Sequence, residues 1–260
     1  MKHRPETGAA PLVIEALLKQ DALGRVERVR CPHARWSLRS AGSGALGVAA
    51  RVLLRRERRA LSALQGLSGV PQVSAGCACP DALAAHSARL LRTWIDGVPL
   101  PAAEALPADW FDQLELLVRA LHARGVCHND LHKEPNLIAG ADGWPWIVDF
   151  QLASLHRGTG RVFRARCADD LRHVEKHRRR YKLAGRSKDV LTPAERALPP
   201  RSTLAWAWRR GGKPIYQALT RGLLDWRDGE GRGVGELRRP ESGPWPLTLP
   251  PRGPRPATGG

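Results

Sequence analysis

Two polar segments, each placed against an apolar run, constrain this chain more than any other feature. The first covers residues 126–136 and reads V-C-H-N-D-L-H-K-E-P-N, and the second covers residues 146–151 and reads W-I-V-D-F-Q. Two strands that return side by side would carry Asp130, Asn136 and Asp149 to one edge of a sheet. Carboxylate and amide oxygens are the hard ligands that Mg²⁺ takes, with phosphate oxygens completing its shell. The pattern therefore favours a magnesium and phosphate site at that edge.

The same segments resemble the catalytic loop and the metal-binding turn of the protein-kinase-like superfamily, whose motifs read H-R-D-L-x-x-x-N and D-F-G. The likeness is greatest to bacterial kinases of the RIO and lipopolysaccharide-core kinase type, which are similar to serine/threonine protein kinases. It is specific within residues 126–151. Asn136 and Asp149 are 13 residues apart, a normal kinase separation, whereas Asp130 and Asn136 are six apart, one more than usual. Gln151 replaces a glycine, which could take positive φ without cost.

The resemblance extends over residues 12 to about 226 and implies an α+β, two-lobed protein-kinase-like fold. The expected N-lobe, residues 1–95, is small and mostly β with one helix. The expected C-lobe, residues 96–226, is larger and mostly α, with ATP bound in the cleft between the lobes. Residues 227–260 are rich in Gly, Pro and Arg and are predicted to form a disordered tail.

The kinase resemblance also implies roles for individual residues. Asp130 would accept or orient the proton of the acceptor hydroxyl, and Lys133 would neutralise charge on the transferred phosphate. Asn136 and Asp149 would hold Mg²⁺ against the phosphates. Catalysis would then consist of positioning and charge stabilisation. The alternative is that these are ordinary polar loop residues beside core strands.

A glutamate on an apolar helix face is the second feature with a functional reading. Residues 50–65 have helical periodicity, and Glu57 lies on the same face as the leucines. A carboxylate that faces a core is costly without a partner. The resemblance implies pairing with a basic strand residue that touches the nucleotide phosphates. Arg30 is the best positional match and Arg35 the second, and an ordinary edge ion pair with a neighbouring arginine is the alternative.

Two further segments bear on nucleotide binding. Residues 90–97 resemble the linker between kinase lobes, where backbone groups near Thr93 and Ile95 would bind adenine; a plain edge strand and turn is an equal alternative. Two strands, 12–19 and 25–31, would form a hairpin over the nucleotide. Its turn lacks a G-x-G-x-x-G loop, because Gly24 is the only glycine there, so the expected phosphate lid is minimal.

Helical patterns follow in the second half of the chain. Asp109 is a suitable N-cap for a helix that runs to about Arg124. Asp169 or Asp170 is expected to cap a helix over 171–181. Residues 203–226 are expected to form closing helices, although a membrane-surface segment is an alternative.

The region 161–188 is strongly basic and could dock a phosphorylated acceptor or an anionic membrane surface, with a solvated helix face as the alternative. Within it, His173 and His177 have the spacing of a zinc pair, but no third ligand is evident.

The net charge indicates which classes of partner are favoured, and the cysteines indicate the compartment. The 42 basic and 25 acidic residues give a net charge of +17, which favours anionic partners but is also what an arginine-rich, GC-rich coding sequence produces. The five cysteines form no C-x-x-C pair and suggest reduced thiols. No apolar run approaches the roughly 20 residues that span a bilayer. We therefore expect a cytoplasmic protein, with a peripheral location at the inner membrane face as a further possibility.

These observations predict an ATP-dependent kinase that transfers the γ-phosphate to a hydroxyl, with ATP and Mg²⁺ as cofactors. The first hypothesis for the acceptor is a serine or threonine of a protein, and the second is a sugar of the lipopolysaccharide core. The third hypothesis is a nucleotide-binding pseudokinase scaffold without transfer. DNA binding is not expected.

Overall fold

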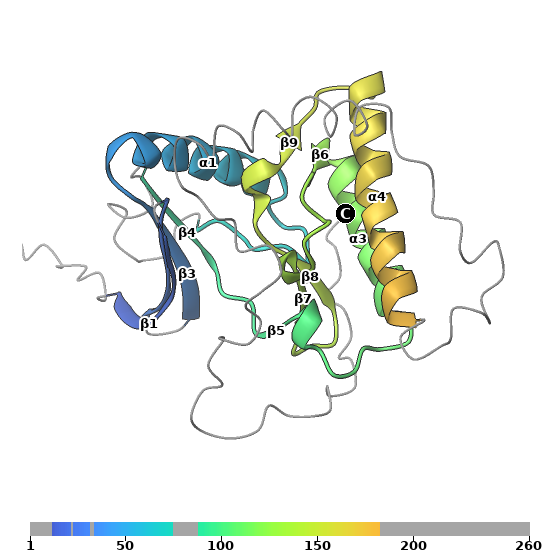
Figure 1. Ribbon diagram of the computed structural model, residues 1–260, viewed down its shortest axis with the longest axis horizontal. Coiled ribbons are helices and arrows are strands. Elements are labelled where there is room, and N and C mark those ends of the chain that lie inside the picture. The colour runs from blue at the N-terminus through green and yellow to red at the C-terminus, as the bar shows by residue number, and fades with distance from the viewer. Residues whose placement is uncertain (1–11, 22, 32–33, 75–87, 183–260) are drawn as a thin grey trace, which may run out of the picture. The chain divides into compact units, whose positions relative to one another are not determined.

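The computed structural model describes residues 12–21, 23–31, 34–74 and 88–182 (Figure 1). The chain is α+β and divides into two units. Within the described residues, the first unit consists of 12–96 with 147–154, and the second of 97–146 with 155–182. The segment with Asp149, expected in the 96–226 part, thus groups with the first unit. The expected closing helices, the tail and the basic stretch beyond Lys182 lie outside the described residues.

An antiparallel sheet forms most of the first unit, with strand order β1-β2-β3-β4. The strands are β1 (Val13–Asp21), β2 (Gly24–Cys31), β3 (Ala34–Ala41) and β4 (Arg89–Thr93). The expected hairpin is confirmed, whereas β3 was not predicted. Val73 forms an isolated antiparallel bridge to Arg92. Val29, Leu38 and Leu91 form a core on one face of this sheet.

Helix α1 (Gly44–Ala63) covers the opposite face of β3 and β4. It begins six residues earlier than predicted, because glycines in its first turns weaken the helical signal. One of them, Gly47, is required, since a Cβ there would collide with the Gly42 carbonyl oxygen. Cross-strand pairing sets Arg39 opposite Leu90, and Ser37 opposite Arg92. Side chains alternate along a strand, so Arg39 and Arg92 share one face, and both reach Glu57 of α1.

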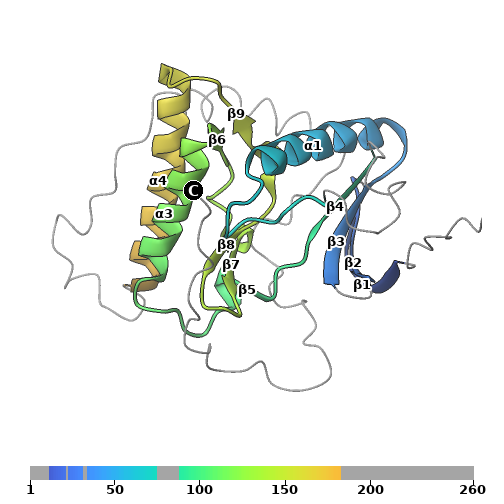
Figure 2. The same ribbon diagram turned by 180° about the vertical axis from the view of Figure 1, so that it is seen from behind.

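Short strands and two long helices make up the second unit. β5 (Gly97–Pro99), β7 (Leu137–Gly140) and β8 (Pro145–Ile147) form one sheet, and β6 (Val126–Cys127) pairs with β9 (Ser154–Leu155). Among the described residues, three short 3₁₀ turns connect these elements. η1 (Leu100–Ala102) follows β5, η2 (Glu134–Asn136) lies between β6 and β7, and η3 (Phe150–Leu152), in the first unit, lies between β8 and β9. Helices α3 (Trp110–Ala123) and α4 (Arg161–Lys182) run side by side (Figures 1 and 2).

The prediction for α3 is confirmed and that for α4 needs correction. Asp109 occupies the N-cap position of α3, although its side chain makes no capping hydrogen bond, and Gly125 follows the end of the helix with φ 72°. The apolar face of α3 is buried as its spacing indicates. Helix α4 begins at Arg161, ten residues before the predicted start, so Asp170 lies in mid-helix and caps nothing. The prediction relied on Asp169 and Asp170 as residues that precede a helix, but both lie within α4.

The structure bears on two further expectations, the reduced state of the cysteines and the lack of a membrane-spanning segment. Cys31 is disulfide-bonded, so the expectation of reduced thiols is wrong at this position. Cys127 and Cys167 are free thiols. Among the helices of the described residues, none combines the length and the apolar character needed to cross a bilayer.

Candidate functional site

A buried carboxylate between two arginines is the central feature of the first unit. Glu57 is 0% exposed. Its Oε1 lies 2.5 Å from a guanidinium nitrogen of Arg92, and its Oε2 lies 3.4 Å from one of Arg39. Glu57 therefore faces the core, and the carboxylate has the partners that burial requires.

The prediction that Arg30 pairs with Glu57 is wrong. Arg30 lies on β2, 59% of its side chain is exposed, and its Nε contacts Glu15 at 3.1 Å. Arg35 contacts Glu15 as well, at 3.6 Å. The physical reason is topological: α1 covers β3 and β4, so β2 lies one strand too far away. Arg39 was missed because β3 was missed; the alternation of Trp36 and Leu38 was the signal available.

Arg39 also binds the segment that carries Asp149. Its NH1 lies 3.2 Å from Asp149 Oδ1. With its amide oxygen turned to the guanidinium, Gln151 accepts from Arg39 at 3.1 Å. Burial disfavours the Arg39 cation, but the Glu57 and Asp149 carboxylates outweigh it and raise the Arg39 pKa. One guanidinium thus joins a strand, a helix and the second motif.

The backbone at Asp149 is left-handed, with φ 65°. Non-glycine residues seldom adopt this conformation, and it costs of order 1–3 kcal/mol unless the surroundings hold it. Gln151 lies within η3, so no glycine is needed at that position. The unusual φ falls two residues earlier than the comparison with D-F-G suggested.

Asp130 lies at the centre of the second unit's polar cluster and is 3% exposed. His132 Nδ1 lies 3.1 Å from its Oδ1, and Lys133 Nζ lies 3.5 Å from its Oδ2. Asn136 Nδ2 donates to Oδ2 at 3.2 Å and to the Asp130 carbonyl at 3.0 Å. The 3₁₀ turn η2, which begins at Glu134, takes up the additional residue between Asp130 and Asn136. The structure therefore brings three of the predicted site residues into contact.

The donor chemistry at Asn136 and Asp149 suits a hard cation. The amide nitrogen of Asn136 is directed to Asp130, which leaves its Oδ1 as an oxygen ligand. Asp149 contributes a carboxylate with 32% of its side chain exposed. Oxygen ligands of this kind fit Mg²⁺. Asn136 belongs to the second unit and Asp149 to the first.

A second buried carboxylate, Asp170 of α4, holds the backbone before Asp130. It is 1% exposed and accepts from the His128 N–H at 2.8 Å and from the Asn129 N–H at 2.9 Å. His122 Nε2 lies 3.1 Å from the same carboxylate. Asn129 has φ 65°, the only other positive φ of a non-glycine residue in the described ranges. Sequence reasoning took Asp170 for a cap and missed this role.

A signal for Asp170 was present in the sequence. Phe163, Asp170, Val174 and His177 are all buried and recur at helical spacing on α4. An acidic residue within an apolar stripe is the pattern that singled out Glu57. The helix boundary, placed too late, concealed it.

The end of α4 holds the loop after Asp130. His177 Nε2 lies 2.8 Å from the Leu131 carbonyl, and burial lowers the His177 pKa, so the neutral ring donates here. Glu134 contacts Arg180 at 2.5 Å and accepts from the Tyr181 hydroxyl at 3.0 Å. Burial and Glu134 raise the Tyr181 pKa to about 12. His177 is thus committed to the loop, which speaks against a zinc pair with His173.

The predicted adenine-binding residues lie at the end of β4. The Thr93 N–H donates to the Gln72 carbonyl at 2.9 Å, and the Thr93 hydroxyl accepts from the Gln72 N–H at 2.9 Å. The Thr93 N–H is therefore taken by the sheet edge and is not available to a base. Within the described ranges, the backbone of Ile95 makes no hydrogen bond.

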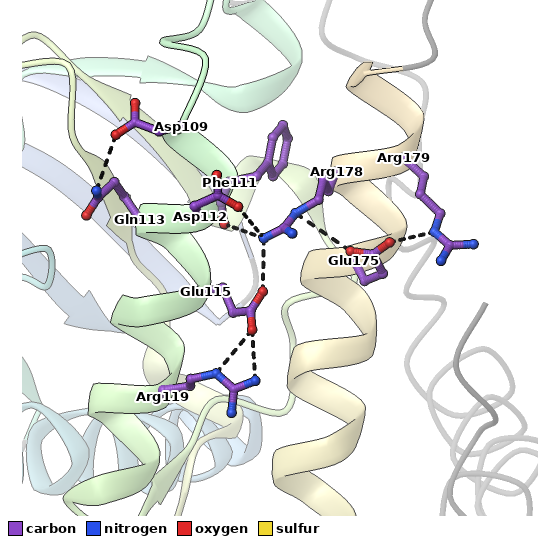
Figure 3. Close-up of polar contacts among 9 residues, drawn as sticks. All are labelled: Asp109, Phe111, Asp112, Gln113, Glu115, Arg119, Glu175, Arg178 and Arg179. Carbon is purple, nitrogen blue, oxygen red and sulfur yellow. Dashed lines mark hydrogen bonds and ion pairs between the residues drawn. The ribbon is translucent and has the colours of Figure 1, made fainter. Parts of the chain in front are cut away.

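Two arginines of α4, Arg178 and Arg179, are paired with acidic residues (Figure 3). Arg178 lies 2.9 Å from Glu115 and 3.1 Å from Asp112, and it donates to the Phe111 carbonyl at 3.1 Å. Arg179 lies 2.6 Å from Glu175. These arginines join α4 to α3 or to its own surface and offer little free charge to an anionic partner.

No protein-family model matches the chain, and no curated protein matches it. The kinase resemblance therefore rests on the two motifs, and it stays a prediction.

Proposed function

We propose that the chain is an ATP-dependent phosphotransferase with a two-lobed, protein-kinase-like fold, acting on a serine or threonine hydroxyl of a protein. The observation that carries the proposal is the guanidinium of Arg39, which contacts both Glu57 and Asp149. These three residues are far apart in the sequence but in contact in the first unit. Such contacts are what a kinase site needs if Arg39 and Glu57 form the pair that aligns the phosphates and Asp149 is the carboxylate that binds the metal. An ordinary core ion pair would need neither Asp149 nor its left-handed backbone.

In this proposal, Asn136 Oδ1 and the Asp149 carboxylate hold Mg²⁺, which when bound supplies positive charge to the phosphates. Arg39 orients the phosphates through its planar fork. Glu57 and Arg92 keep Arg39 in place, because their pairing is buried.

Asp130 is the residue that receives or orients the acceptor's proton. Asn136 and Lys133 contact Oδ2 of its carboxylate, and His132 contacts Oδ1. Lys133, 42% exposed at its side chain, can turn from Asp130 to a phosphate. Asp170 holds the preceding amides and so limits movement of the loop.

A nucleotide-binding pseudokinase is the second candidate, and one observation favours it. The Arg39 guanidinium already has Glu57, Asp149 and Gln151 as partners. Binding of phosphates must displace one of them, and arginine is not equivalent to the compact ammonium of lysine.

Single-turnover consumption of Mg²⁺-ATP by the full chain separates these candidates. Parent, Asp130→Asn and Arg39→Lys are compared, with protein fractions and lipopolysaccharide core as acceptors in separate reactions. Asp130→Asn should largely spare ATP affinity and lower turnover roughly 10²- to 10⁴-fold. Arg39→Lys should preserve or raise transfer.

The matched control is Arg30→Lys, which alters an exposed arginine on the neighbouring strand and should change nothing. No transfer by the parent, together with a rise in Tm on addition of Mg²⁺-ATP, would establish the pseudokinase. Equal transfer by parent and Asp130→Asn would remove Asp130 from its role. Absence of any Mg²⁺-ATP binding would reject both candidates.

A further inference from the structure

Three potential ligands of a soft metal converge in the second unit. His122 comes from α3, Cys127 from β6 and Cys167 from α4. One donor atom from each lies within 4.8 Å of the other two. The two sulfur atoms are 3.6 Å apart. The proposed phosphotransferase activity uses none of these three side chains.

We propose that His122, Cys127 and Cys167 form a Zn²⁺ site. Zn²⁺ binds thiolates at about 2.3 Å in tetrahedral geometry, which puts two sulfur ligands roughly 3.8 Å apart. The observed 3.6 Å is close to that separation. The sulfur atoms of a disulfide are about 2.05 Å apart. Cys127 and Cys167 would therefore have to come much closer together to form a disulfide than to bind Zn²⁺.

A hydrogen bond to Asp170 fixes the tautomer of His122. Its Nε2 lies 3.1 Å from Asp170 Oδ2, so this nitrogen carries the proton and donates to the carboxylate. The lone pair is then on Nδ1, the nitrogen left for a metal. Histidine ligands commonly donate their second nitrogen to a carboxylate, which fixes the tautomer and raises the basicity of the ligand. Asp170 would therefore support the metal as well as the loop before Asp130.

The charge balance also favours a divalent cation. Cys127 and Cys167 are free cysteines. Binding of Zn²⁺ would release one proton from each thiol to solvent and leave two thiolates on the metal. The metal and its two thiolates together carry no net charge, which suits a site where Cys127 is fully buried. Three protein donors leave the fourth position for water.

The site would couple metal binding to the order of the loop. Cys127 directly precedes His128, whose N–H is bound by Asp170. A metal would thus join α3, β6 and α4 at the point where the chain enters the loop. This consequence holds whether or not the chain transfers phosphate.

The test is metal uptake by the full chain in chelator-free buffer with a non-thiol reductant. Zn²⁺ retained after gel filtration is measured, and Co²⁺ is used as a spectroscopic probe. We expect stoichiometric Zn²⁺, a rise in Tm, and the visible and thiolate charge-transfer bands of tetrahedral Co²⁺. Cys167→Ser, which changes a partly exposed residue, should lose the charge-transfer band and most of the retained Zn²⁺, and His122→Ala should weaken both.

The matched control is His156→Ala. His156 packs against the same Phe163 ring as His122 but lies outside the cluster. It should take up Zn²⁺ as the parent does. Failure of the reduced parent to retain Zn²⁺, or equal retention by Cys167→Ser, would overturn the proposal. A Cys127–Cys167 disulfide in the air-oxidised chain, with no uptake after reduction, would overturn it in favour of a redox pair.

Discussion

Glu57 and Asp170 are both buried carboxylates, yet their partners differ in kind. Glu57, 0% exposed, is neutralised by the guanidinium groups of Arg39 and Arg92. Asp170, 1% exposed, accepts from two backbone N–H groups and contacts one histidine. Long side chains can be redirected when a ligand arrives, whereas backbone amides cannot leave without moving the chain. Glu57 therefore suits a site that rearranges, and Asp170 suits a loop that stays fixed.

Glu57→Gln should produce the largest effect, because it leaves Arg92 buried without a carboxylate and leaves Asp149 as the one carboxylate in contact with Arg39 among the described residues. We expect the free energy of unfolding in urea to fall by about 3–5 kcal/mol, the usual cost of breaking a buried ion pair. The control is Glu15→Gln, whose arginine partners are more exposed; about 1 kcal/mol or less is expected there. Equal losses in the two variants would refute the distinction drawn from burial.

Asp170→Asn should cost less and act locally. The amide keeps an acceptor but loses the charge, and hydrogen bonds to charged groups contribute about 1.5–3 kcal/mol. We expect faster hydrogen exchange at the amides of His128 and Asn129 and a loss of stability within that range. Asp169→Asn, at the adjacent and less buried position, is the control. Unchanged exchange at both amides would show that the loop does not depend on Asp170.

His173, on the same helix, should make stability depend on pH. Burial lowers its pKa to about 4, and His132, His177 and Arg172 add to this while Asp170 opposes it. An unfolded histidine has a pKa of about 6.5, so the folded state binds the proton less well. Stability should be complete above about pH 6.5 and fall as the pH drops toward 4, by about 2 kcal/mol at pH 5. His173→Gln should flatten this part of the curve; parallel curves for parent and variant would contradict it.

Arg119→Ala should have the smallest effect. Arg119 is 58% exposed and contacts Glu115 at 2.8 Å, one turn away on α3 (Figure 3). Exposed pairs of this spacing contribute about 0.3–0.5 kcal/mol. The hydrogen bond from Arg119 is the main reason that the Glu115 pKa is lowered, so NMR titration of the variant should show that pKa rise. A loss comparable to that of Glu57→Gln would mean that exposure does not set the difference.

The sequence predicted most where one element contains its own signal. Helix α3 followed from an N-cap, an apolar period and a terminal glycine, all within 17 residues. The burial of Glu57 followed from its position on an apolar helix face, although the helix start was misplaced. The partner of Glu57 did not follow, because choosing between Arg30 and Arg39 requires knowing which strands α1 covers. That information lies in the sheet order, not in either strand.

Contacts between distant elements escaped prediction for the same reason. His122, Cys127 and Cys167 have no motif spacing, since three different elements supply them. The contact of Arg39 with Asp149 joins residues 110 positions apart. The Asp130–Asn136 contact, by comparison, spans six positions, and the motif had predicted both residues in one site.

The left-handed backbone at Asn129 and Asp149 has a consequence for which substitutions the chain tolerates. Glycine, asparagine and aspartate take this conformation with the least strain, and β-branched residues take it with the most. In a saturation library at position 129, a selection for folded protein should therefore retain mainly glycine, asparagine and aspartate, because the backbone is the constraint there. At position 149 the same set should pass a selection for folded protein, while a selection for phosphotransfer should reject glycine. Two screens of one library would thus separate the demand of the backbone from the demand of the chemistry.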